Sequence, residues 1–283
     1  MNKKIIPYLF LLPSMAGCSI FLVVPYFDVL RRSFLRAGSG FVGMQNFIEV
    51  WNNEAFRLAT KNTVQFTAVC IPLLLVLSFV IALYIYDHPR LGGFLRTGFL
   101  MPMAMPVASV VLVWRCLFDY QGILNGILDM TGAQPLNWME SETAFWILVG
   151  SYVWRNLGYH IILWLAALSA LHPSAIEAAR LDGANRLQCH LHITLPQMKS
   201  SMGIIGIIAV LNSFKVFREA YLVAGDYPHE SMYLQQHLFT NWFRNLEMDK
   251  IAAASVMDSV VLIVLILILQ RKWDRRESHE EPN

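Results

Sequence analysis

The sequence predicts an all-α membrane protein with six transmembrane helices, and its composition and long apolar runs lead to this fold class. Of the 283 residues, 56% are hydrophobic and only 15% are charged, with a mean hydropathy of +0.46. A soluble protein carries about 25% charged residues. Residues 5–27 and 62–86 are uncharged throughout, and about 20 apolar residues cross a bilayer as a helix. Helices also satisfy their own backbone hydrogen bonds, as hydrocarbon requires.

The six spans are expected to form one membrane domain that covers residues 1–283. Their expected bounds are residues 5–27, 62–86, 97–118, 143–171, 200–222 and 251–270. The first run follows Lys3 and Lys4, but it is too long for a signal peptide and has no small-residue cleavage site. We therefore expect it to remain as a helix. The second run has no charged residue, and the third is uncharged from Thr97 to Trp114.

The last three spans contain charged residues. Arg155 interrupts the fourth, Asp258 lies in the sixth, and Lys215, Arg218 and Glu219 lie in the second half of the fifth. Ionisable groups within a membrane usually face the bundle interior or a water-filled path. Lys215 and Glu219 are four residues apart and are expected to pair on the helix surface. Two interpretations remain open for the others: internal ion pairs, or a cation that meets an acidic substrate such as a uronate-bearing oligosaccharide or a phosphorylated polyol.

The distribution of Lys and Arg predicts that both termini are cytoplasmic. With that orientation the inner segments hold eleven of these residues and the outer segments hold seven, in agreement with the positive-inside rule. The first outer loop, which has five of them, opposes the rule. Residues 172–199 and the tail from Arg271 are therefore expected on the cytoplasmic side.

Several classes of function are excluded. A net charge of +2 without a cluster of basic residues excludes a nucleic-acid-binding protein, because such proteins bind phosphates with clustered Lys and Arg. The four cysteines form no CxxC pair, so neither a disulfide framework nor a metal site is indicated. The chain has no GxxxxGK[ST] loop to hold nucleotide phosphates, so it is not an ATPase. No span carries a Ser–His pair, an HExxH motif or paired carboxylates, which opposes a membrane-embedded enzyme.

The polar segment between the fourth and fifth spans, residues 172–199, carries the most information. Ser174 and Glu177 are spaced as a capping box that would start a short helix. Gly183 would end this helix, because glycine adopts the left-handed stop conformation at little cost. Leu195 and Pro196 would begin the next span, since proline is tolerated at a helix start. Such a helix is suited to docking on a soluble partner, although an ordinary interfacial helix is an alternative.

This segment resembles a known family. Glu177-Ala178-Ala179, Gly183, Ile193 and Leu195-Pro196 stand at the spacing of the EAA signature of permease subunits from bacterial ATP-binding-cassette importers. The resemblance implies that the segment is a coupling loop that sits in a cleft of an ATPase subunit. Its implied coupling residues are Glu177, Ala178, Ala179, Gly183, Leu195 and Pro196.

Other segments are similar to the sugar-importer permeases of maltose and glycerol-3-phosphate systems. The matching segments are PYLFLLPS at 7–14 with Gly17, Pro25 and Ser33-Phe34; Arg96-Thr97 through Pro102 and Pro106 to Phe118-Asp119; and Gly122-Ile123-Leu124-Asn125. The chain departs from the commoner pattern at Gly225-Asp226-Tyr227-Pro228, where many members have a Gly-Gly-Pro turn. The departure bears on the identity of the sugar more than on the class of protein.

A polar face on the fourth span is a candidate substrate site. Tyr152, Asn156 and Tyr159 fall at i, i+4 and i+7, on one side of a helix. Aromatic rings stack on sugar rings and amides pair with hydroxyls, but the same side chains also bridge helices. The family resemblance favours sugar binding here and implies further contacts at Asn212, Ser213 and Met103.

The expected function is therefore that of a membrane permease subunit of a sugar importer in the bacterial cell membrane, which works by alternating access and is not itself an enzyme. The resemblance implies a second, homologous permease, two ATPase subunits that carry ATP and Mg, an extracellular solute-binding protein, a carbohydrate substrate and membrane lipid. We expect no cofactor on this chain and no nucleic-acid partner. The alternatives are the same type of importer for another solute, such as a glycerol-phosphate or a peptide, and an ATP-independent secondary transporter.

Overall fold

The computed structural model describes residues 6–36, 38–213 and 228–277, and these are helical apart from one short hairpin and connecting turns. The first helices are α1 (Ile6–Cys18), the π-helical turn η1 (Ser19–Val23), α2 (Val24–Ser33), α3 (Gln45–Asn52), α4 (Glu54–Asp87), α5 (Pro89–Ala104), α6 (Val107–Phe118) and α7 (Ile123–Met130). The hairpin strands are β1 (Leu35–Arg36) and β2 (Gly40–Phe41).

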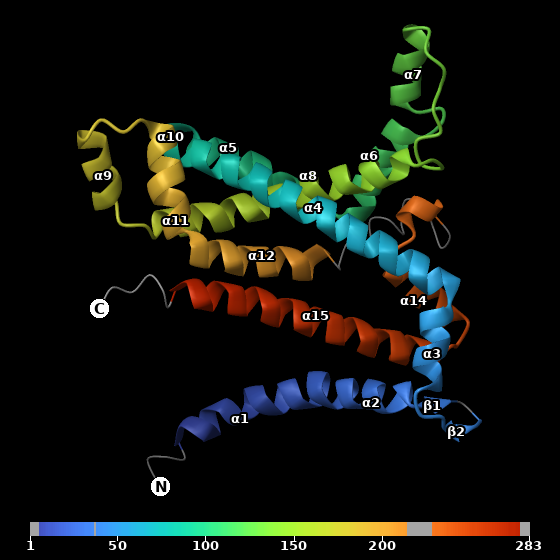
Figure 1. Ribbon diagram of the computed structural model, residues 1–283. Helices are drawn as coiled ribbons and strands as arrows, with labels where there is room; N and C mark the ends of the chain where they lie inside the picture. The colour runs from blue at the N-terminus through green and yellow to red at the C-terminus, as the bar shows by residue number, and fades with distance from the viewer. Residues whose placement is uncertain (1–5, 37, 214–227, 278–283) are drawn as a thin grey trace. The chain divides into compact units, whose positions relative to one another are not determined.

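The second half of the chain is also helical. Its elements are α8 (Thr143–Ser169), α9 (Ser174–Leu181), α10 (Arg186–Cys189), the π-helical turn η2 (His190–Thr194), α11 (Leu195–Gln197), α12 (Lys199–Ser213), the 3₁₀ turn η3 (Glu230–Met232), α14 (Gln235–Arg244) and α15 (Met248–Glu277). Figure 1 shows these elements along the chain. The predicted Lys215–Glu219 pair, Arg218, and Gly225 to Tyr227 of the departing segment lie outside the described residues.

The chain divides into two compact units. Unit 1 comprises residues 1–57 and 238–265, and unit 2 comprises residues 58–237 and 266–283. Each unit is described by itself, and the prediction of one domain over residues 1–283 stays a prediction.

A polar clasp stabilises the loop of unit 1 that follows α2. Asn46 is 1% exposed and its Nδ2 donates to the carbonyls of Ser33 (3.0 Å) and Leu35 (2.9 Å). Nη2 of Arg36 donates to Oδ1 of Asn46 (3.1 Å) and to Oε2 of Glu49 (2.5 Å). Its Nε lies 3.6 Å from Oδ2 of Asp249. The hydrogen bond and charge of Arg36 lower the pKa of Glu49 from its ordinary value.

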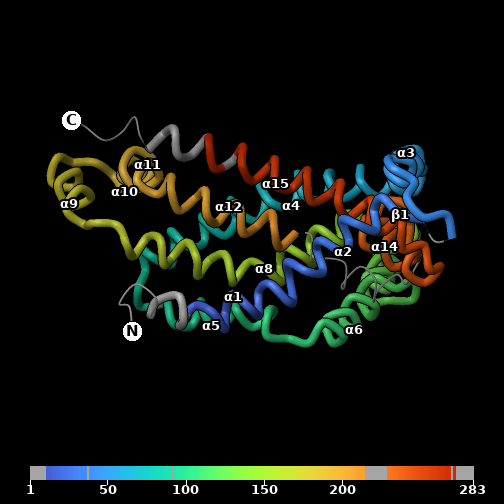
Figure 2. Tube along the Cα trace, turned by 90° about the horizontal axis from the view of Figure 1, so that it is seen from below, coloured from blue at the N-terminus to red at the C-terminus, as the bar shows by residue number. Residues whose placement is uncertain are grey.

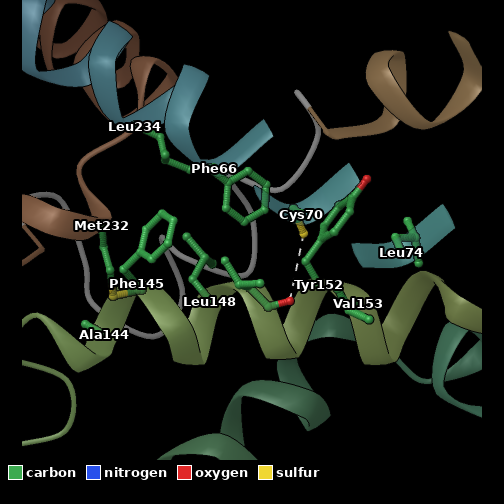
Figure 3. Packing of buried hydrophobic residues seen from close by; sticks show 11 residues of the cluster. Phe66, Cys70, Leu74, Ala144, Phe145, Leu148, Tyr152, Val153, Met232 and Leu234 are labelled. Carbon is green, nitrogen blue, oxygen red and sulfur yellow. Dashed lines mark hydrogen bonds between the residues drawn. The ribbon is translucent and has the colours of Figure 1, made fainter. Parts of the chain in front are cut away.

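The core of unit 2 lies between α4 and α8. Figure 3 shows Phe66, Cys70 and Leu74 of α4 facing Phe145, Leu148 and Tyr152 of α8, with Met232 and Leu234 closing one end of the cluster. A second buried cluster joins the later parts of the same helices to α12; it contains Ala82, Ile85, Ile161, Trp164, Leu165, Leu168, Met198 and Ile205. Two side-chain hydrogen bonds also connect α4 to neighbouring segments. Nε1 of Trp164 donates to Oγ of Ser78 (3.0 Å), and Nδ2 of Asn62 donates to the carbonyl of Tyr233 (3.1 Å).

The predicted third span, residues 97–118, is not one helix. The chain forms α5 and α6 with a break at Met105, whose backbone is extended (φ −70°, ψ 137°). Proline disfavours the helical conformation in the residue before it, and Pro106 follows Met105. Nη2 of Arg155 on α8 points at the freed carbonyl of Met105, at 3.5 Å.

Four described helical segments are long and apolar enough to cross a membrane. They are Leu11–Ser33, Glu54–Asp87, Val107–Met130 and Met248–Ile268. Two bent pairs, Thr143–Ser169 with Ser174–Leu181 and Arg186–Gln197 with Lys199–Ser213, raise the number to six if each pair forms one span. The predicted all-α membrane class is therefore confirmed, and four to six candidate spans agree with the predicted six, with shifted bounds and with residues 214–222 outside the described part.

Candidate functional site

The segment between α8 and α12 stands apart from the packed helices of unit 2. Figures 1 and 2 both show α9 and α10 beyond the ends of α8 and α12. The axis of α9 is bent by 76° from α8, and the helix Arg186–Gln197 is bent by 73° from α12. We call residues 172–199 the docking loop.

The first helix of the docking loop begins at Ser174, the residue predicted to cap it, so the cap position lies one residue earlier than predicted. The cap position is Pro173, which has helical dihedral angles (φ −69°, ψ −21°), and no side chain caps this end. Ser174 is therefore already helical, and a capping side chain needs an extended residue. The predicted capping box of Ser174 with Glu177 is wrong. Glu177 is instead exposed on the first turn.

The end of α9 follows the prediction. Gly183 has φ +88° and lies one residue beyond the C-cap. The N–H of Ala184 donates to the carbonyl of Ala179 (2.9 Å), and that of Gly183 donates to the carbonyl of Arg180 (3.1 Å). This pair of bonds is the Schellman arrangement, which needs the left-handed residue.

The second helix of the docking loop starts with a true capping box that sequence reasoning missed. The backbone N–H of Gln188 donates to Oδ1 of Asn185, and the backbone N–H of Asn185 donates to Oε1 of Gln188, both at 2.8 Å. The signal was present as Asn185 followed three residues later by Gln188, a spacing that marks a helix start. The glycine stop and this cap together fix the turn between α9 and α10.

The residues Leu195 and Pro196 end this second helix instead of beginning the next span, contrary to the prediction. The chain widens into η2 just before Leu195, whose N–H donates to the carbonyl of His190. It then bends at Met198, where α12 starts. Pro196 lacks an N–H and would clash with the carbonyl four residues back, so a wider turn in front of it relieves both. The turn η1 stands in the same relation to Pro25.

The surface of the docking loop presents large apolar side chains. Leu181 is 89% exposed, Leu187 is 65% exposed and Leu191 is 51% exposed. Leu187 and Leu191 are four residues apart and share one helix face. Ile176, by contrast, is only 8% exposed. The loop therefore buries one apolar residue of α9 and leaves three leucines available to a partner.

A polar contact ties the docking loop to the end of α4. Nε2 of His190 lies 3.0 Å from Oδ2 of Asp87, and both side chains are 14% exposed. The other ring nitrogen, Nδ1, lies 3.5 Å from Oγ1 of the buried Thr194. Nη1 of Arg186, on an exposed side chain, is 4.0 Å from the same carboxylate oxygen. No sequence signal joins Asp87 to a histidine that lies 103 residues later.

The three predicted residues of α8 lie in different surroundings. Tyr152 is 3% exposed, and its ring meets the edge of Phe66 at a centroid distance of 5.4 Å. Asn156 is half-buried, and its Nδ2 donates to the carbonyl of Tyr152 (2.9 Å). Tyr159 is half-buried beside the ring of His160. Tyr152 is thus part of the core, whereas Asn156 and Tyr159 lie at its margin.

The other predicted substrate contacts lie on α12 and α5. Ser213 is buried, donates to the carbonyl of Val210 (2.7 Å) and lies 3.4 Å from the hydroxyl of Thr67 on α4. Asn212 is half-buried, and Met103 is 47% exposed two residues before the break at Met105. The structure brings Tyr152 and Ser213 to neighbouring residues of α4, Phe66 and Thr67.

Gly158, which sequence reasoning passed over, sets the approach of α5 to this face. A Cβ at this position would overlap the carbonyl oxygen of Phe99 on α5. The two backbones therefore touch between Asn156 and Tyr159. Glycine inside a long apolar helix was the available signal, since small residues mark close helix approaches in membranes.

Comparisons with known proteins agree with each other. Residues 61–279 match the family described as binding-protein-dependent transport system inner membrane component. The chain is 28% identical over 99% of its length to the probable ABC transporter permease protein YurN of Bacillus subtilis (strain 168), of which it covers 99%. It is also 28% identical, over 94% of its length and 88% of the relative, to the arabinooligosaccharides transport system permease protein AraP of the same strain. A crystal structure of a bacterial ABC transporter involved in the import of the acidic polysaccharide alginate contains a chain with a TM-score of 0.86, 22% identity and 95% coverage of both chains.

Proposed function

Because the chain belongs to the family of binding-protein-dependent transport system inner membrane components, we propose that it is the permease subunit of an ATP-binding-cassette importer of carbohydrate. It is a multi-pass membrane protein and a transport subunit. The carbohydrate assignment is supported by relatives such as AraP, whose transport system is named for arabinooligosaccharides. The proposed role for this chain is to provide half of the path, with a second, homologous permease providing the other half.

The observation that carries the proposal is the exposed apolar surface of the docking loop. Leu181, Leu187 and Leu191 lie on a segment that turns sharply away from the helices on either side of it. A contiguous apolar patch outside lipid marks a site of protein interaction, and we propose that these leucines form such a patch. The EAA residues Glu177, Ala178 and Gly183 are exposed on the same segment. We assign this surface to an ATPase subunit that binds ATP and Mg, while this chain itself binds no cofactor.

The proposed orientation places the docking loop and both termini in the cytoplasm, with the solute-binding protein on the opposite side. ATP-driven closure of two ATPase subunits would move their docked loops and switch the helix bundle between inward and outward access. Tyr152, Asn156, Tyr159, Asn212, Ser213 and Met103 are the proposed carbohydrate contacts. Asn156 and Tyr159 are the strongest of them, because their half-buried polar groups remain partly accessible.

Charge substitution on the docking surface tests the proposal. Leu181→Asp should abolish copurification of the ATPase, because a carboxylate would have to enter the apolar contact. Met130→Asp is the matched control, since Met130 is 88% exposed at the end of α7. We expect that variant to copurify the ATPase normally. Retention of the ATPase by Leu181→Asp, in an assembled complex that transports, would contradict the docking assignment.

The orientation has a separate test. A cysteine probe at Gln134 should react with an impermeant reagent added from outside, and a probe at Arg186 should not. The reverse labelling pattern would place the docking loop outside the cell and remove its role.

A further inference from the structure

The docking loop is joined to the membrane helices by two sharp bends. Its covalent links are residues 170–173 after α8 and Met198 before α12, and the chain turns by 76° and 73° at these points. A bend has no continuous run of helical hydrogen bonds across it, so it transmits force less directly than a straight helix. Within the loop, α9 packs against α10 and η2. The loop is therefore one structural body with two angular covalent links.

Asp87 and His190 make a third link, and it reaches a helix that is not adjacent to the loop in sequence. Asp87 is the last residue of α4, and His190 is the first residue of η2. Each side chain is 14% exposed, so the contact is largely shielded from water. Met198, at the bend, belongs to the same buried cluster as Ala82 and Ile85 of α4. The Asp87–His190 contact adds a polar link of 3.0 Å between the body of the loop and the end of α4.

Asp87 lies at the end of a long helix whose middle reaches the proposed substrate residues. α4 has 34 residues, which at 1.5 Å per residue makes it about 50 Å long. Its middle carries Phe66 and Thr67, which contact the proposed substrate residues Tyr152 and Ser213. α4 continues from Asp87 past the internal Pro72 to Phe66 and Thr67, so one helix connects the contact at Asp87 to the proposed substrate region.

We propose that Asp87 and His190 are positioning residues that couple the docking loop to α4 during transport. The inference rests on the proposed function and adds to it a named path from the loop to the membrane helices. Neither residue touches the carbohydrate or the nucleotide. Their role is to make α4 follow the loop, so that ATP hydrolysis on the partner changes the access of the substrate region.

The test compares the ratio of carbohydrate imported to ATP hydrolysed in the reconstituted complex, across four variants. Asp87→Ala and His190→Ala should each lower this ratio about tenfold while the ATPase still copurifies. The double variant should be no worse than either single variant, because both remove the same contact. His190→Gln keeps an N–H donor at the end of the side chain and should restore much of the ratio.

His88→Ala is the matched control. His88 lies next to Asp87 but outside the docking loop, and its Nδ1 contacts the carbonyl of Tyr84 on α4 (2.8 Å). This variant should behave as wild type. A wild-type ratio in His190→Ala, or additive losses in the double variant, would overturn the inference. A wild-type complex that retains no ATPase and imports no carbohydrate would instead overturn the proposed function.

A reversible cross-link covers the case in which the alanine variants fail to assemble. Asp87→Cys with His190→Cys, in a background whose four native cysteines are replaced by alanine, is linked by a short reducible bis-methanethiosulfonate reagent. The linked complex should couple ATP hydrolysis to import, and reduction of the same sample should uncouple it. Equal coupling before and after reduction would overturn the inference, as would failure of the two positions to cross-link.

Discussion

At the crossing of α5 and α8 a backbone carbonyl occupies the space where a side chain would lie, whereas in the docking loop three leucines are more than half exposed. Gly158 lets the carbonyl of Phe99 come so close that no Cβ fits. In the docking loop, Leu181 keeps 89% of its surface exposed. Packing within the chain determines the first region, and local hydrogen bonds determine the backbone of the second, whose exposed leucines we propose as the docking surface.

This difference explains which substitutions each region tolerates. A packed crossing responds to added volume, because interiors have no space for an extra methyl group. The docking loop responds to changes in backbone conformation and surface chemistry. Glycine appears in both regions for different reasons: Gly158 for close approach and Gly183 for its φ of +88°.

The largest effect is expected for Gly158→Ala. The added methyl would overlap the backbone of α5, and overpacking of this kind costs about 1–3 kcal/mol or more. The midpoint of thermal unfolding in detergent should fall by several degrees. Gly150→Ala on the same helix is the control, because nothing lies within 4 Å of its Cβ position. Equal midpoints for the two variants would show that the crossing is not tight.

Next comes Gly183→Val in the docking loop. A left-handed non-glycine residue costs about 1–2 kcal/mol, so the Schellman stop should be lost and the ATPase should copurify poorly. Gly132→Val carries the same backbone strain at φ +76° outside the loop. That control should be strained to a similar degree but should keep its ATPase. Normal transport by Gly183→Val would show that the helix stop at Gly183 is not needed for docking of the ATPase.

Asn156 and Tyr159 of α8 lie beside the packed crossing at Gly158, and they are polar and only half-buried. Asn156→Ala should leave assembly intact, since within the described residues its amide donates to a carbonyl of its own helix. If carbohydrate binds there, an unmade hydrogen bond costs roughly 1–3 kcal/mol, or about tenfold to a hundredfold in affinity. Uptake kinetics and basal ATP turnover measure this. Loss of assembly would assign Asn156 to helix packing, and unchanged uptake would remove it from the path.

A smaller effect is expected at the cap of the second loop helix. Asn185→Ala removes a capping side chain and should cost about 1 kcal/mol of local stability. Glu177→Ala removes no cap, so any effect on transport should come from the partner surface alone. Hydrogen exchange of residues 186–189 should accelerate in the first variant and stay at the wild-type rate in the second. Equal acceleration in both variants would show that Glu177 does act as a helix cap.

The smallest effect concerns the clasp of unit 1. Because Arg36 lowers the pKa of Glu49 in the folded protein, this pair contributes stability at neutral pH. The contribution is lost as the pH falls from the ordinary glutamate value of about 4.3 through the lowered pKa. Partly exposed pairs contribute little, so Glu49→Gln should flatten the acid side of the stability profile only slightly. An unchanged profile would show that the ion pair is not formed.

The sequence predicted the fold class, the family and the glycine stop, because each depends on short-range patterns. Apolar runs identify spans, and Gly183 is the residue that its backbone conformation requires. The family match confirms the resemblance drawn from Glu177 to Pro196. The break at Met105 and the π-helical turns were missed, although Pro25, Pro106 and Pro196 stand directly after them.

Contacts between distant residues could not be predicted from one sequence. The Asp87–His190 bond and the approach of Phe99 to Gly158 depend on how helices pack, which no local pattern encodes. Two of the five basic residues that opposed the positive-inside rule form ion pairs in unit 1. Arg32 pairs with Asp28, and Arg36 with Glu49 and Asp249. Paired bases of this kind report loop structure as well as membrane orientation.

The most direct test of the account is carbohydrate-stimulated ATP hydrolysis in the reconstituted complex. The complex would contain this chain, its permease partner, the ATPase subunits and the solute-binding protein, and it would be assayed with a panel of neutral and acidic oligosaccharides, glycerol-phosphates and peptides. We predict that at least one oligosaccharide raises the ATPase rate, and that Leu181→Asp abolishes the stimulation. Stimulation by a glycerol-phosphate or a peptide alone, or import that proceeds without ATP, would contradict the account.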